Sequence, residues 1–350
     1  MTGLERAWRP ARLHVVTGKG GTGKTTVAAA LALALAGGGA RVLLVETEGR
    51  QGIAQVFDTP PLPFEETSVA LASDGGEVRA LPIDPEEAVL EYLDIFYRLR
   101  RAGWALRRTG ALDFATTIAP GVKDVLITGK VKELVDRMGE GRTHYDAVVM
   151  DAPPTGRITQ FLTVTAEVAG LAGVGPIKSQ SESVARVMRS EQTLVHVVSI
   201  LEEMPVQETA DAVAEMTDAG LHVGHILVNM VRPLHFPPER LTDAASGRLD
   251  AGAVAADLRR VGLPASPETV TALLDEARDH AQRLLQEREL RERLHHIHRP
   301  TIELPLLTGP MDLSAVYGLA TTLREAGVTT AARVVREGST KPRGRRDGAS

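Results

Sequence analysis

Short apolar runs alternate with longer stretches of helical periodicity along most of this chain. Six runs have the length of buried β-strands: Leu13–Val16, Arg41–Val45, Ala147–Met150, Leu194–Ser199, His225–Val228 and Thr301–Leu304. The alanine- and leucine-rich stretch 27–36 predicts a helix between the first two strands. Such alternation is typical of βαβ units, in which helical crossovers join parallel strands. The pattern therefore predicts an α/β fold with a mostly parallel sheet covered by helices on both faces.

Two regions depart from this alternation and are helical in pattern. One extends from about residue 84 to 140, and the other, about 268–297, repeats apolar residues at helical spacing. The last residues, 335–350, are rich in Gly, Pro and Arg without apolar content, which predicts a disordered basic tail. We therefore expect one domain over residues 1–334, with a helical insertion and a second helical block.

Composition narrows the classes of protein to which the chain can belong. Its 350 residues are 43% hydrophobic and 24% charged, with a formal net charge of -5. This balance gives no general attraction to nucleic acid, and with aromatic residues at only 3%, no nucleic-acid partner is expected. The absence of cysteine excludes disulfides and thiolate metal sites. Because the chain has no signal-peptide pattern and no long apolar segment, we expect a cytoplasmic location.

The most specific motif lies between the first predicted strand and the first predicted helix. Residues 18–26, here called the phosphate loop, read G-K-G-G-T-G-K-T-T and match the Walker A pattern G-x4-G-K-[ST]. Glycines let backbone N–H groups approach phosphate oxygens, and the N-terminus of the following helix adds partial positive charge. Lys24 would supply a full charge to the β- and γ-phosphates, and Thr25 a hydroxyl for Mg²⁺.

The same glycines also allow a different interpretation. Gly18, Gly20 and Gly23 satisfy the dinucleotide-binding pattern G-x-G-x-x-G, and Glu46 falls where that fold needs a ribose-binding acid. The lysine and threonine that follow Gly23 have no role in a dinucleotide site, and a second nucleotide-type segment follows near residue 151. We therefore favour the phosphate-loop interpretation.

The second segment is M-D-A-P-P-T-G at 150–156, directly after the apolar run 147–149. By itself, Asp151 could be an ordinary strand-end residue in a turn. Together with the phosphate loop, it is placed where a nucleotidase needs a carboxylate that holds Mg²⁺ directly or through water.

These two motifs together resemble the ArsA/Get3 family of anion-transporting and tail-anchored-protein-targeting ATPases, which have a deviant Walker A loop. The resemblance extends over about residues 12–330, and it implies a P-loop NTPase fold. More narrowly, E-G-R-Q-G-I-A-Q-V-F (48–57) and G-A-L-D-F-A-T-T-I-A-P-G (110–121) resemble an actinobacterial branch in which two unlike ArsA-like subunits are paired.

The resemblance implies roles for individual residues. The triphosphate would be cradled by Gly20, Gly21, Thr22, Gly23, Lys24, Thr25 and Thr26. Lys19 would be the signature lysine that reaches across a dimer interface to the partner's phosphates, and Asp151 the switch II carboxylate and Mg²⁺ ligand. Asn229 would hydrogen-bond adenine, Glu202 would touch the nucleoside, and Pro305 would lie in the loop beside the base.

Three departures from the family pattern bear on activity. Glu48 stands where the family has the aspartate that positions the attacking water, and its extra methylene could cost on the order of a hundredfold in rate. Arg157 stands where the family usually has histidine. Without cysteine, the thiol-based zinc and metalloid sites of some members are excluded, and the cluster His295, His296 and His298 predicts a solvated helix end.

The leading prediction is a cytoplasmic ATPase that couples MgATP hydrolysis to dimer closure, as a homodimer or with a paralogous subunit. The helical insertion would transmit this closure to a hydrophobic client or a membrane-protein partner. One alternative is a weakly active or inactive ATP-binding regulatory subunit, because of Glu48. Another is a positioning ATPase of the Min/Par type.

Overall fold

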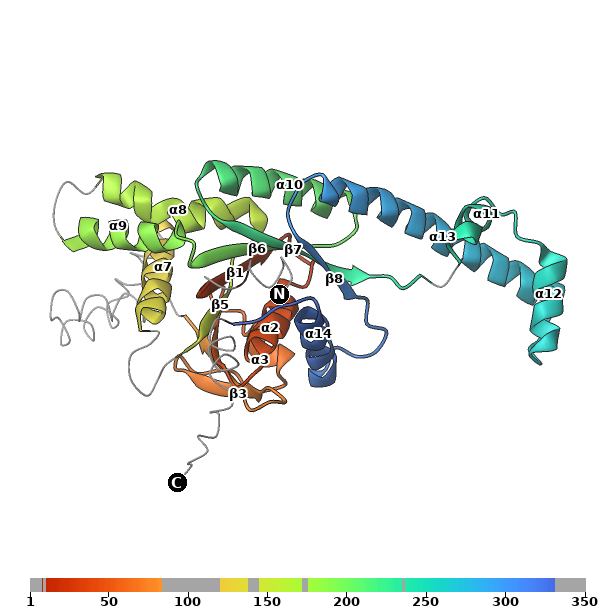
Figure 1. Ribbon diagram of the computed structural model, residues 1–350, viewed down its shortest axis with the longest axis horizontal. Helices are drawn as coiled ribbons and strands as arrows, with labels where there is room; N and C mark the ends of the chain where they lie inside the picture. The colour runs from red at the N-terminus through yellow and green to blue at the C-terminus, as the bar shows by residue number, and fades with distance from the viewer. Residues whose placement is uncertain are drawn as a thin grey trace, which may run out of the picture.

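The computed structural model describes residue 8 and residues 11–83, 120–137, 145–171, 176–234 and 237–330. Its centre is an eight-stranded sheet in the order β3-β4-β2-β5-β1-β6-β7-β8 (Figure 1). Neighbouring strands are parallel throughout, except that β3 runs antiparallel to β4 at one edge. The predicted α/β fold of a P-loop NTPase is confirmed.

All six predicted strands are present, and two more were missed. The strands are β1 Leu13–Gly18, β2 Arg41–Glu46, β3 Thr67–Leu71, β4 Glu77–Pro82, β5 Ala147–Asp151, β6 Thr193–Ser199, β7 Val223–Val231 and β8 Thr301–Pro305. β1 and β5 are buried along their whole length, so their sequences are continuous apolar runs. The missed strands β3 and β4 lie at the sheet edge and include polar, partly exposed residues, which weakens the apolar signal.

Helices cover both faces of the sheet and create two cores. The helices are α2 Lys24–Leu35, α3 Gly52–Val56, α7 Pro120–Asp136, α8 Thr155–Leu171, α9 Pro176–Met188, α10 Glu203–Asp218, α11 Leu241–Ala245, α12 Ala251–Arg260, α13 Pro267–His295 and α14 Leu313–Glu325. On one face, α2, α3 and α14 pack against alternate strand residues such as Val16 and Leu44. On the other face, α7, α8, α9 and α10 pack against their neighbours Val15 and Leu43.

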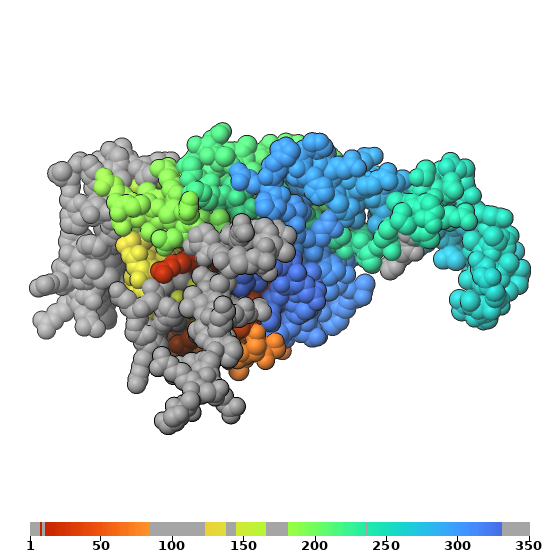
Figure 2. Space-filling view, in the orientation of Figure 1, coloured from red at the N-terminus to blue at the C-terminus, as the bar shows by residue number. Residues whose placement is uncertain are grey.

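The connection between β7 and β8 forms a helical arm. Its main element is α13, which spans most of the predicted helical block at about 268–297. α11 packs on α13 through Leu241, Ala244, Ala281 and Leu284. α12 has no buried residue and lies with α11 at the end of the arm that is remote from the sheet (Figures 1 and 2).

Parts of the sequence-based predictions lie outside the described residues. Of the predicted helical insertion, only residues 120–137 are described. They form the helix α7 and one turn residue that follows it. The predicted tail, 335–350, and most of the motif at 110–121 are also outside that part of the chain. Within the described residues, no helix is long and apolar enough to cross a membrane.

Candidate nucleotide-binding site

The phosphate loop joins the end of β1 to the start of α2, at the carboxyl edge of the sheet. A Cβ at Gly18 would lie 2.3 Å from the carbonyl oxygen of Val198 on β6, so only glycine fits there. Gly23, at the N-cap of α2, has a φ of 83°, a left-handed conformation that also favours glycine. At Gly20 and Gly21, a Cβ would meet nothing within 4 Å. The loop therefore has open space in front of its backbone, as an anion cradle requires.

Thr25 and Asp151 meet at the centre of this edge. The Thr25 hydroxyl donates a hydrogen bond of 2.6 Å to Oδ2 of Asp151, so the structure brings together the two predicted Mg²⁺ ligands. Asp151 is buried, and its Oδ1 has no hydrogen-bond partner among the described residues. A hydroxyl and a carboxylate with a free oxygen are ligands that suit Mg²⁺, so these residues fit the ion.

The electrostatic environment of Asp151 is unusual for a carboxylate. The pKa of Asp151 is raised to about 6: burial is the largest cause and the carboxylates of Glu46 and Glu48 add to it, while the Thr25 hydrogen bond and the Lys24 charge oppose the shift. A divalent cation at this position would favour the ionised form. The arrangement therefore concentrates negative charge at the point where a metal ion would neutralise it.

The two glutamates after β2 have different surroundings. Glu46 pairs in register with Asp151 and accepts hydrogen bonds from the backbone N–H groups of Gly52 and Ile53, at 3.1 and 3.5 Å. It caps the start of α3, so it does not have the free carboxylate that a dinucleotide site would need. Glu48 lies in the following loop and forms an ion pair with Arg50 at 3.8 Å.

Lys19 makes a contact that the sequence did not predict. Its Nζ donates a hydrogen bond of 2.6 Å to Oε1 of Glu208 on α10. The Thr155 hydroxyl, at the first residue of α8, donates to Oε2 of the same carboxylate at 3.4 Å. Glu208 therefore joins the phosphate loop to the segment after Asp151. The contact between Lys19 and Glu208 spans 189 positions and could not be inferred locally.

The three residues expected at the nucleoside lie in or just after the adjacent strands β6, β7 and β8. Asn229, on β7, is buried and donates from Nδ2 to the carbonyl oxygen of Thr22 at 3.0 Å, so it supports the phosphate loop. The amide oxygen takes no part in this bond. Glu202, the residue before α10, is exposed, and Pro305 is the last residue of β8. The strand order places these residues on one side of the strand that leads into the phosphate loop.

Within the described residues, Arg157 and the histidine cluster make no hydrogen bond or ion pair with the phosphate loop. Arg157 Nη2 donates to the carboxylate of Asp124 on α7 at 3.3 Å. Burial raises the pKa of Asp124, whereas the Arg157 charge lowers it. His295, His296 and His298 are exposed around the end of α13, as the prediction of a solvated helix end requires.

Comparison with known proteins gives a consistent result. The family profile described as anion-transporting ATPase matches residues 11–189, which include the phosphate loop, Glu48 and Asp151. The ATPase BagA of Mycobacterium tuberculosis is 51% identical over 318 residues, which cover 91% of this chain and 94% of that protein. An arsenical pump-driving ATPase of Acidiphilium multivorum is 29% identical over 238 residues, covering 62% of this chain and 39% of that protein.

Proposed function

The chain belongs to the family of anion-transporting, ArsA-type ATPases, and from this premise we propose that its phosphate loop binds MgATP and that its neighbouring carboxylates support hydrolysis. One observation supports the proposal most. The Thr25 hydroxyl and the buried Asp151 carboxylate meet at 2.6 Å, and Asp151 keeps a carboxylate oxygen without a partner among the described residues.

Each part of the proposed site has a physical role. The backbone N–H groups of the loop and the Lys24 ammonium group bind the triphosphate. Thr25 and Asp151 would hold Mg²⁺, and the bound ion would neutralise charge on the phosphate oxygens. Glu48 orients the attacking water, and its field already acts on Asp151. The extra methylene of glutamate places this carboxylate less favourably than aspartate, so we expect a slow enzyme.

Lys19 supports the proposal that the site is completed by dimerisation. Its side chain is 31% exposed and pairs with a Glu208 side chain that is 35% exposed, so the bond can exchange for another partner. We propose that Lys19 leaves Glu208 on closure and contacts the phosphates of a second subunit, either an identical chain or a paralogous one. There it would stabilise charge on the transferring phosphoryl group, as an arginine finger does.

A route from the site towards a client is also part of the proposal. Asp151 and Arg157 lie in one continuous segment, and Arg157 pairs with Asp124 on α7. α7 is the described part of the predicted helical insertion at about 84–140. Movement of the segment after β5 would therefore reach the region that we propose to contact a hydrophobic client or membrane-protein partner.

Measurement of ATP turnover tests the enzymatic part. Purified full-length chain should release phosphate with Mg²⁺ present, and the Lys24→Ala variant should not. The same samples, titrated with a fluorescent ATP analogue in Mg²⁺ or in EDTA, report binding separately from turnover. Wild-type turnover no higher than that of Lys24→Ala would overturn the enzymatic proposal.

One observation favours a second candidate, an ATP-binding regulatory subunit with little activity. The carboxylate expected to position water is paired with Arg50 in the same loop. The variants Glu48→Asp and Glu48→Gln distinguish the candidates. If Glu48 supports hydrolysis, Glu48→Gln abolishes turnover, whereas a regulatory subunit has no turnover to lose while it still binds the ATP analogue.

A further inference from the structure

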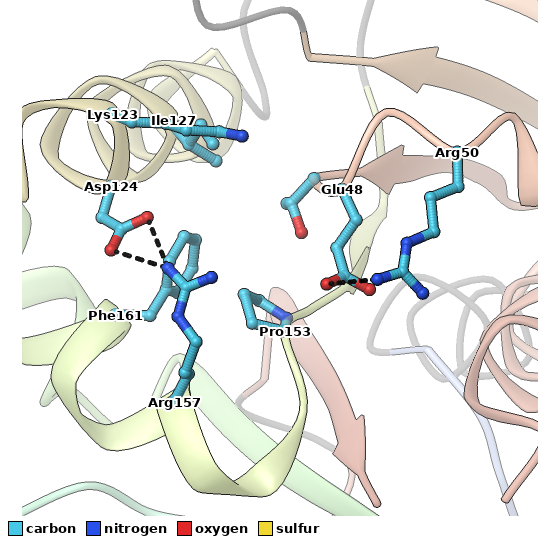
Figure 3. A pocket seen from close by; sticks show the side chains of 9 residues that line it. Glu48, Arg50, Lys123, Asp124, Ile127, Pro153, Arg157 and Phe161 are labelled. Carbon is cyan, nitrogen blue, oxygen red and sulfur yellow. Dashed lines mark hydrogen bonds and ion pairs between the residues drawn. The ribbon is translucent and has the colours of Figure 1, made fainter. Parts of the chain in front are cut away.

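A pocket beside the proposed ATP site carries charges that this site does not use. It has a volume of about 220 Å³ and lies between the loop after β2, the first turns of α7 and the start of α8 (Figure 3). Its apolar wall is formed by Ile127, Pro153 and Phe161. A small polar ligand could therefore occupy it, with charged groups at the rim.

The rim has an excess of positive charge. Arg157 pairs with Asp124 at 3.3 Å, and Arg50 pairs with Glu48 at 3.8 Å. Lys123 is the third cation, and none of the carboxylates in the described part of the chain lies within ion-pair distance of it. The two arginines are each balanced by a carboxylate. The charge of Lys123 is not balanced in this way, so the pocket lining carries one net positive charge.

The cations also keep hydrogen-bonding capacity. Both bonds from Arg157 to Asp124 come from Nη2 alone, so Nε and Nη1 are not used in that pair. Arg50 approaches Glu48 at a distance longer than a hydrogen bond. In Figure 3, Lys123 extends from α7 towards the loop that carries Glu48, and Arg157 extends from α8 towards α7. Three segments thus contribute donors to the lining, and in Figure 3 Glu48 lies between Arg50 and the other two cations.

We propose that this pocket binds a tetrahedral oxyanion, and that its ligand is the inorganic phosphate released by hydrolysis. Guanidinium and ammonium groups are the side chains that bind phosphate oxygens most strongly. The pocket also adjoins the proposed reaction site, since Glu48 lines it and the hydroxyl of its neighbour Thr47 donates to the carbonyl oxygen of Asp151 at 2.7 Å. That the bound phosphate is the product of ATP hydrolysis rests on the proposed function. The binding of phosphate in this pocket does not.

Titration of inorganic phosphate into the nucleotide-free full chain tests the binding. Isothermal calorimetry on the wild type is compared with Lys123→Ala and Lys24→Ala. Loss of a charge-assisted contact should weaken phosphate binding about tenfold or more in Lys123→Ala. Binding should persist in Lys24→Ala. The matched control is Lys132→Ala, a lysine on α7 that pairs with Asp136 and does not line the pocket.

The opposite pattern would overturn the proposal. If Lys24→Ala abolishes phosphate binding and Lys123→Ala leaves it intact, the anion occupies the phosphate loop. If Lys123→Ala and Lys132→Ala weaken binding equally, the effect is one of net charge and not of a pocket. Lys123→Glu provides a second variant, for which reversal of the charge should abolish binding.

The source of the phosphate needs a second experiment. In a single turnover of bound ATP, cleavage is followed by acid quench and phosphate release by a fluorescent phosphate sensor. If the pocket retains product, release lags behind cleavage in the wild type, and the lag shortens several-fold in Lys123→Ala. An unchanged lag, with binding lost in calorimetry, would overturn the assignment to product. If no ATP is cleaved at all, the proposed function fails, while the calorimetric result still decides the binding site.

Discussion

At the carboxyl edge of the sheet the chain buries Asp151 at the end of β5, whereas within other strands of the same sheet it buries three histidines against Trp8. His14, His196 and His225, on β1, β6 and β7, are fully or almost fully buried. His14 and His196 share a hydrogen bond of 3.1 Å, and Trp8 stacks on His196 and His225 with ring centroids 4.7 and 4.2 Å apart. Burial lowers the pKa of His14 to about 3 and that of His225 to about 4.

Both regions contain buried polar atoms without hydrogen-bond partners in the described structure, but the surroundings differ. Oδ1 of Asp151 lies beside a glycine loop with open space in front of it. The ring nitrogens of His225 lie under a stacked indole ring. An unpartnered atom thus indicates a ligand site only where the backbone leaves room for a ligand. In the histidine cluster, aromatic packing offsets the missing hydrogen bonds.

The largest expected effect is a loss of ATP turnover on substitution of Asp151, the buried polar residue that we assign to the reaction. Asp151→Asn removes a charged Mg²⁺ ligand, so we expect ATP turnover to fall about a hundredfold to a thousandfold. Stability in urea should not fall, because the neutral amide needs less desolvation than a buried carboxylate. Turnover is measured by phosphate release and stability by urea unfolding. A variant that keeps turnover within tenfold of the wild type would contradict the assignment.

The second largest effect is expected in acid, where protonation of the buried histidines should lower the free energy of unfolding. The pKa values of these histidines are depressed in the folded chain, so the unfolded chain binds protons first as the pH falls below 6.5. Their contribution to stability is therefore full above pH 6.5 and is lost progressively towards pH 4 and below. Each histidine contributes a slope of up to about 1.4 kcal/mol per pH unit in the free energy of unfolding.

The variant His225→Phe tests this slope. Phenylalanine keeps a ring under Trp8 and removes one titrating group, so urea unfolding between pH 7.5 and 5 should show a shallower loss of stability. His296→Ala, at an exposed position, serves as the control and should leave the slope unchanged. Equal slopes for His225→Phe and the wild type would show that His225 is not the source.

A smaller effect is expected at Asn229, which supports the loop by its bond to Thr22. Asn229→Ala should weaken ATP binding about tenfold, because a buried acceptor loses its donor and adenine loses an amide partner. GTP binding should weaken less, since guanine presents a carbonyl oxygen where adenine presents an amino group. Competition against a fluorescent ATP analogue measures both. An equal loss for both nucleotides would restrict Asn229 to supporting the loop.

The smallest effect concerns the bond between Lys19 and Glu208. Both side chains are about one third exposed, so the pair is worth no more than about 1 kcal/mol. Glu208→Gln should free Lys19 and lower the ATP concentration needed for dimerisation about twofold to fivefold, as measured by sedimentation. Lys19→Ala should raise it. If Glu208→Gln also raises it, the carboxylate supports the dimer and does not restrain Lys19.

The sequence predicts the contacts that follow from one segment or from the shared carboxyl edge of parallel strands, and it misses those that a helix brings to this edge from elsewhere. The spacing of Gly18, Gly23 and Lys24 fixes a loop between a strand and a helix, and the structure confirms this placement. The approach of Thr25 to Asp151 followed from the general geometry of parallel strands. Glu208 could not be found in this way, since α10 brings its carboxylate to Lys19 only after the sheet has formed.

The histidine cluster was missed for a related reason. Each histidine lies singly in a different apolar run, where nothing in the local sequence indicates three imidazole rings under one indole ring. The edge strand β3 and its neighbour β4 were missed because partial exposure admits polar residues such as Ser68 and Arg79. Burial on both faces gives a strand its clearest sequence signal.

The length of α13 has a mechanical consequence. At 29 residues, the helix is about 43 Å long. Near its end, Arg293 contacts Glu203 and Gln207 on α10, the helix that also carries Glu208. A tilt of about 10° at this fulcrum would displace the opposite end, where α12 lies, by about 7 Å. A small displacement of α10, whose Glu208 pairs with Lys19, would therefore become a larger displacement at α12.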